Sequence, residues 1–122
     1  MGPSVVVLAS DPKTAQSLAG GLGHFFHSVV VANSRDELRE KVATNRPEAV
    51  VLDMEYSRLT EVRNLRHDFP ELPIVCTHRI PDEELWLAAL EAGASDICPA
   101  DDAETVVRSV LRSVEVSRGA AA

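Results

Sequence analysis

Four short and almost wholly apolar runs recur along the chain, and helical patterns separate them. Such continuous runs are typical of strands that are buried on both faces of a parallel sheet. The runs are residues 4–9 (SVVVLA), 29–32 (VVVA), 49–52 (AVVL) and 74–76 (IVC), with a weaker fifth at 97–98. Parallel strands need crossover helices, so the pattern predicts an α/β fold: a doubly wound, five-stranded parallel sheet covered on both faces.

The segments between these strands carry helix start and stop signals. Asp11 is a typical N-cap, and Pro12 after it is a typical first helical residue. Ser34 and Glu37 form a capping box at the start of the next helix. Further helices are expected over 59–69, over 82–90 and from Asp101 or Asp102 to 114. In the fourth helix we expect Leu87, Leu90 and the alanines to face inward and Trp86 to point partly outward. Residues 1–116 are then one domain, and 117–122 a frayed tail or linker remnant.

Charge and composition exclude several classes of function. Twelve basic and nineteen acidic residues give a net charge of −7, which repels phosphate backbones and anionic lipids. We therefore expect no nucleic-acid or membrane partner for this domain. The longest apolar run, residues 85–90, is far shorter than the ~20 residues of a membrane span. Two cysteines without a secretory signal indicate a cytoplasmic protein with free thiols.

Ligands of such sheets bind beyond the carboxyl ends of the strands. The side chains expected there belong to Ala9, Ser10, Asp11, Asn33, Asp53, Thr77, His78, Cys98 and Pro99. Four stretches around these positions, 7–12 (VLASDP), 47–53 (PEAVVLD), 72–75 (LPIV) and 89–96 (ALEAGASD), together resemble the receiver domain of bacterial two-component response regulators. The resemblance covers residues 5–114. It implies a flavodoxin-like fold with strand order 2-1-3-4-5 and a signalling module of a phosphorelay, not an enzyme.

The resemblance also implies a site. Asp53 stands where the family has its phosphoacceptor, which works with Mg²⁺ held by an acidic pair after the first strand. Alignment on Pro12 places Ala9 and Ser10 at that pair. A shift of one residue would instead make Ser10 and Asp11 the pair, with Asp11 and Asp53 as metal ligands. Glu55 is either another metal ligand or a solvated loop residue.

Other positions depart from the family pattern. The lysine that follows the fifth strand in the family is replaced by Cys98 or Ala100, neither of which is charged. His78, or Thr77 one residue earlier, takes the switch position of the fourth strand. The loop after Asp53 is about three residues shorter than in the family. The resemblance therefore implies a degenerate receiver that needs no cofactor, with Mg²⁺ involved only if Asp53 accepts a phosphoryl group.

Three functions follow from these residues. The first is signalling through protein–protein contacts, with a histidine kinase or an output domain as partner and Trp86 as an exposed anchor. A homodimer through the face formed by the fourth helix, fifth strand and fifth helix belongs to the same hypothesis. The second is Mg²⁺-dependent phosphorylation at Asp53. The third is a ligand or redox module that uses Cys76 and Cys98, which lie on neighbouring predicted strands.

Overall fold

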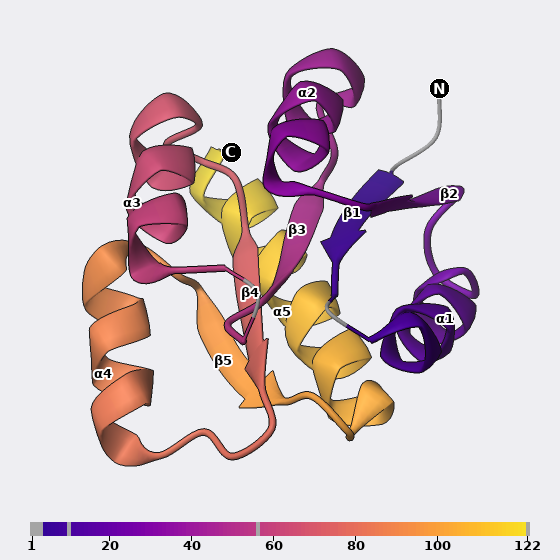
Figure 1. The fold of residues 1–122 in the computed structure, drawn as a ribbon. Helices are drawn as coiled ribbons and strands as arrows, with labels where there is room; N and C mark the ends of the chain where they lie inside the picture. Colours follow the sequence, from indigo (N-terminus) through magenta and orange to yellow (C-terminus); the bar gives the residue numbers. More distant parts are fainter. Residues whose placement is uncertain (1–3, 10, 56, 122) are drawn as a thin grey trace.

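A computed structural model describes residues 4–9, 11–55 and 57–121, in which five strands and five helices alternate (Figure 1). The strands are β1 (Ser4–Leu8), β2 (Ser28–Ala32), β3 (Ala49–Asp53), β4 (Ile74–His78) and β5 (Asp96–Pro99). The helices are α1 (Pro12–Leu22), α2 (Arg35–Asn45), α3 (Leu59–Asp68), α4 (Glu83–Ala92) and α5 (Ala103–Ala121). No helix in the described ranges is long and apolar enough to cross a membrane.

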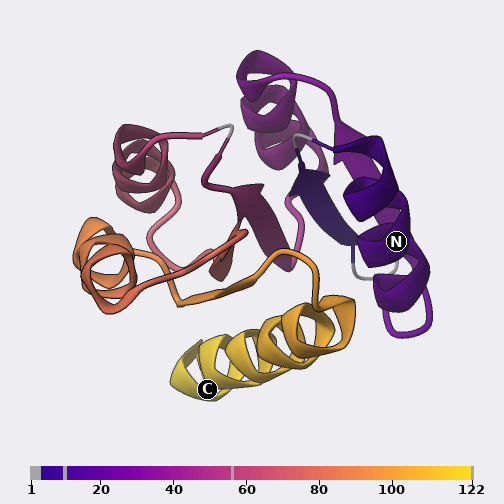
Figure 2. The ribbon, with the colours of Figure 1, turned by 60° about the horizontal axis from the view of Figure 1, so that its bottom comes forward.

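All five strands are parallel and lie in the order β2-β1-β3-β4-β5, so the predicted fold is confirmed. Alternate residues of each central strand enter different cores. Val6 and Leu8 pack beneath α2, α3 and α4, whereas Val5 and Val7 pack beneath α1 and α5 (Figure 2). Because both faces are covered, both sets of side chains must be apolar, which explains the continuous apolar runs.

The helix starts are fixed by local hydrogen bonds. The side chains of Asp11, Ser34, Asp82 and Asp102 each accept a hydrogen bond from a backbone N–H of the first turn, at 2.8–3.2 Å. Each bond satisfies a helical donor that has no partner within its own helix. The caps predicted at Asp11 and Ser34 are confirmed, Asp102 is the residue that caps α5, and the cap at Asp82 is an addition from the structure.

Arg66 of α3 joins the carboxyl ends of α3 and α4. Its Nε donates to the carbonyl of Gly93 at 3.0 Å, and its Nη1 donates to the carbonyl of Pro70 at 2.8 Å. Gly93 ends α4 with φ at +116°, a conformation that favours glycine. The backbone of Gly93 and the stem of Arg66 are packed so closely that a Cβ at position 93 would lie 2.7 Å from the Arg66 Cγ.

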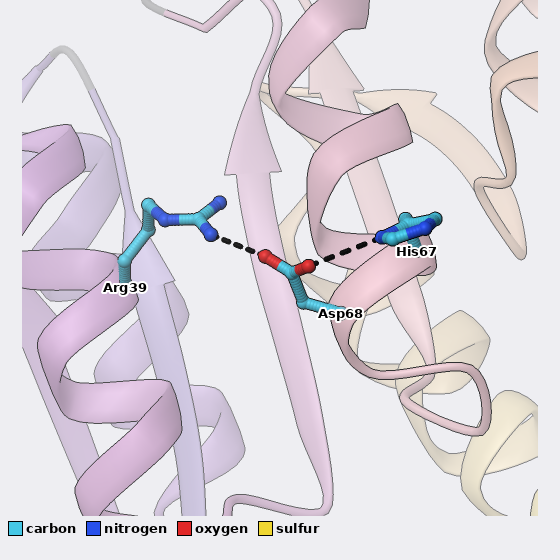
Figure 3. A network of polar contacts seen from close by, with 3 residues as sticks. All are labelled: Arg39, His67 and Asp68. Carbon is cyan, nitrogen blue, oxygen red and sulfur yellow. Dashed lines mark hydrogen bonds and ion pairs between the residues drawn. The ribbon is translucent and has the colours of Figure 1, made fainter.

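A polar bridge joins α2 to α3 on the same side of the sheet. The guanidinium of Arg39 is paired with the carboxylate of Asp68 at the end of α3, and the Nδ1 of His67 lies 3.2 Å from the other oxygen (Figure 3). The hydrogen bond from Arg39, followed by that from His67, holds the pKa of the Asp68 carboxyl below its usual value.

Two details differ from the expectations. Helix α5 continues to Ala121, so the tail expected from residue 117 is helical: Ser117 Oγ donates to the Glu71 carbonyl at 3.0 Å, and Arg118 is paired with Glu48. In α4 the inward face is made by Ala89 and Ala92, whereas Leu87 is exposed. The expectation for Leu87 was wrong because packing against β5 and α3 determines the rotation of this short helix.

Candidate functional site

Asp53 is the last residue of β3 and lies at the carboxyl edge of the sheet, where it is only 3% exposed. Its Oδ1 accepts a hydrogen bond from the N–H of Glu55 at 2.9 Å, and its carbonyl accepts one from the N–H of Ser57 at 2.8 Å. The short loop after β3 therefore turns tightly around Asp53. Ser57 itself is buried, and within the described ranges its hydroxyl has no hydrogen-bond partner.

The end of β4 lies beside Asp53. The register pairs Asp53 with Thr77, which is buried and whose carbonyl accepts from the N–H of Met54 at 2.7 Å. His78 lies one residue further along. Its Nδ1 accepts from the N–H of Ile80 at 3.1 Å, and its carbonyl accepts from the N–H of Ala100 at 2.9 Å. His78 thus organises the loop that follows β4, while Thr77 is the direct neighbour of Asp53.

An ion pair joins the two loops at this edge. The Nε of Arg79, after β4, lies 2.8 Å from the Oε1 of Glu55, after β3. The carboxylate of Glu55 is therefore paired with an arginine of the same chain, and the backbone N–H of Glu55 donates to Asp53. Sequence reasoning missed Arg79, since the only available signal was its place just beyond the end of a predicted strand.

The residues after β1 lie at the same edge. Ala9 is partly buried, and Ser10 lies outside the described residues. The carboxylate of Asp11 accepts from the N–H of Lys13 and from the hydroxyl of Thr14, both at 3.2 Å. Asp11 therefore caps α1. Across residues 4–9, 11–55 and 57–121, no group of three or more His, Cys, Asp or Glu side chains is placed to hold a metal ion.

The two cysteines are buried in different cores. Cys76 packs beneath α4, and Cys98 packs beneath α5 on the other face of the sheet. Burial raises the pKa of the Cys76 thiol to about 12 and that of the Cys98 thiol to about 11. Protonated thiols that point to opposite faces cannot form a disulfide without rebuilding the sheet, which removes the support for a redox pair.

A group of apolar side chains is exposed near the start of α4. Ile80 is 76% exposed, Trp86 43% and Leu87 48%, and we call these three residues the α4 patch. The N-terminus of α4 lies at the same end of the molecule as the tips of β4 and β5 (Figure 1). Trp86 is thus exposed as predicted, but the exposure of Ile80 in the preceding loop and of Leu87 on the same helix was not expected.

Comparisons with known proteins agree with this fold. No family model matches the chain. Curated relatives include response regulator MprA of Mycobacterium sp. (strain KMS), 34% identical over 98 residues that make up 78% of this chain and 43% of the relative. MprA of Mycobacterium leprae (strain TN) is also 34% identical over 98 residues. The chain is a response-regulator receiver domain. It spans less than half the length of these relatives.

Solved structures show the same receiver fold. NtrX from Brucella abortus superposes with a TM-score of 0.86 and 23% identity, over 97% of this chain and 27% of NtrX. A response regulator from Thermotoga maritima superposes with a TM-score of 0.85 and 19% identity, over 94% of this chain and 99% of that one. Receiver domains are signalling modules of two-component systems, and Asp53 occupies the end of β3 in this one.

Proposed function

We propose that this receiver domain signals through protein–protein contacts made by the α4 patch, and that phosphorylation of Asp53 does not drive it. One observation supports this proposal most directly. The carboxylates that could complete a Mg²⁺ site with Asp53 are already engaged, since Asp11 caps α1 and Glu55 is paired with Arg79. Receiver domains use Mg²⁺ for phosphorylation, and among the described residues no group of three or more His, Cys, Asp or Glu side chains is placed to hold an ion.

The charge around Asp53 supports the same conclusion. Transfer of a phosphoryl group to a carboxylate brings negative charges together, and cations must neutralise them. The positions that align with the family's lysine, Cys98 and Ala100, carry no charge. Arg79, after β4, does not supply this charge freely, since its guanidinium is paired with Glu55.

A contact-driven receiver needs a protein partner. We propose a histidine kinase or an output domain in the cytoplasm, as in other two-component systems. The net charge of −7 disfavours nucleic acid and anionic membranes as direct partners. On this proposal Trp86→Ala abolishes partner binding while Asp53→Asn has almost no effect, and pull-down of the cognate kinase with each variant measures both.

The second candidate is a Mg²⁺-dependent phosphoacceptor. It is favoured by the place of Asp53 at the end of β3, beside Thr77. Under this function, Asp53→Asn abolishes signalling at little cost in stability, because the amide keeps the shape of the side chain and can still accept from the Glu55 N–H.

Intact-mass spectrometry separates the two functions. The chain is incubated with Mg²⁺ and acetyl phosphate, alongside Asp53→Asn and a conventional receiver domain that labels in the same buffer. We expect no mass increase for this chain while the conventional receiver is labelled. A labile increase of one phosphoryl group that disappears in Asp53→Asn would refute the contact-only proposal and establish the second function.

A further inference from the structure

Exposed apolar side chains are concentrated at the α4 patch. Six large apolar residues are exposed in the part of the chain that the structure describes, and three of them lie between Ile80 and Leu87. Scattered exposed apolar residues are ordinary, whereas a group of them that includes a tryptophan is typical of a protein interface. The grouping of these three residues around the start of α4 therefore indicates that a partner protein binds there.

The α4 segment itself carries charge of one sign. The segment from 82 to 91 contains four acidic residues and no basic residue. Glu83, Leu87 and Glu91 are four residues apart, so they form one row along α4 with the apolar side chain between two exposed carboxylates. Arg79 precedes this segment, but its guanidinium is paired with Glu55 across the loop.

We propose that the α4 patch binds a cationic amphipathic helix of a partner protein. Apolar side chains of that helix cover Trp86 and Leu87, and its Lys or Arg side chains lie against Glu83, Glu84 and Glu91. Glu83 and Glu91 are eight residues apart, about two helical turns, so an amphipathic helix with cations two turns apart matches the spacing of these carboxylates along α4. The inference names the partner class of the proposed contact function and rests on that function.

Charge also favours a cationic helix over the other partners that could cover the α4 patch. A second copy of this chain carries the same net charge of −7, so the two copies repel each other overall, whereas a cationic helix is attracted. Nucleic acids and anionic lipids are repelled for the same reason. An acidic helix would bury the apolar side chains but would oppose four carboxylates. A cationic helix satisfies both the apolar and the charged part of the surface.

Trp86 makes the test specific, because it is the chain's single tryptophan and lies within the patch. The probe is an amphipathic Lys/Leu peptide of about 18 residues, long enough to form a helix when bound. Its control is a peptide in which Glu replaces every Lys. We expect the Lys/Leu peptide to shift Trp86 emission to shorter wavelength with saturation, more weakly as salt is raised. The Glu/Leu peptide is expected to leave the emission unchanged.

Variants separate the patch from a general attraction to an acidic protein. Leu87→Ser leaves the charge unchanged and is expected to weaken binding roughly thirtyfold, whereas Phe25→Ser, at another exposed apolar residue, leaves it unchanged. Glu83→Gln with Glu84→Gln is expected to weaken binding about fivefold. The matched control is Asp36→Asn with Glu40→Gln on α2, which removes the same charge at a distance from the patch.

Three results would overturn the proposal. They are equal binding of the Glu/Leu peptide, full binding by Leu87→Ser, and an equal loss in the α4 and α2 charge variants. Any of them would reject the cationic helix and leave the contact function to a partner of other chemistry. The proposal that the domain signals through contacts alone has its own test: it is rejected if the mass measurement shows phosphorylation of Asp53.

Discussion

Gly93 and Arg66 offer a quantitative test of how α4 is held in place. Gly93→Ala is expected to destabilise the domain by about 3 kcal/mol. Roughly half comes from placing an alanine at a φ of +116°, and the remainder from displacing the Arg66 side chain, whose Cγ would be 2.7 Å from the new Cβ. Arg66→Ala removes hydrogen bonds to the carbonyls of Gly93 and Pro70. This variant is expected to lose only about 1.5 kcal/mol of stability, because burial opposes the charge of Arg66, as its lowered pKa indicates, and so offsets part of the gain from the hydrogen bonds.

The double variant distinguishes these causes. With Arg66 truncated to alanine, the contact with its Cγ at 2.7 Å is gone, but its Cβ still lies 2.8 Å from the new Cβ, so the backbone strain and a smaller part of the clash remain. The pair is therefore expected to lose roughly 3.5 kcal/mol, compared with about 4.5 kcal/mol if the two losses simply add. Equilibrium urea denaturation, followed by far-UV circular dichroism and Trp86 fluorescence, measures all three variants. Additive losses would show that the close packing of Gly93 on Arg66 carries no energy, and the reasoning would fail.

Three further outcomes are expected. Ser57→Ala changes stability by less than about 1 kcal/mol or raises it, because it removes a buried hydroxyl that has no partner, and urea denaturation checks this. Because the pKa of Asp68 is lowered in the folded state, its carboxylate stabilises the fold at pH values above the ordinary carboxyl pKa of 3.8, and this contribution is lost as the pH falls through the folded pKa. Arg39→Gln removes the main cause of the lowered pKa and should flatten the acid limb of a curve of stability against pH. Cys76 and Cys98, with pKa values raised to about 12 and 11, should react with a disulfide reagent at pH 8 only on unfolding, and rapid reaction of the native chain would contradict their burial.

Local features were predictable because they depend on neighbouring residues. The caps at Asp11 and Ser34 join residues two or three positions apart, so their sequence signals suffice. The place of Asp53 at the site was also predictable, since parallel strands that end together share one edge of the sheet. The extent of α5 was underestimated because Ser117 and Arg118 are held by contacts with Glu71 and Glu48, which lie far away in the sequence.

By itself, the sequence determined the order of strands and helices, the parallel sheet and the edge at which Asp53 lies, because buried strands and helix caps leave periodic, local patterns. Only the tertiary structure decided how side chains from separate elements meet. It pairs Glu55 with Arg79, sends Cys76 and Cys98 to opposite faces, and exposes Leu87 beside Trp86. These outcomes depend on strand register and helix rotation, and a shift of one residue in either would move each side chain to a different face without changing the pattern that predicts the fold.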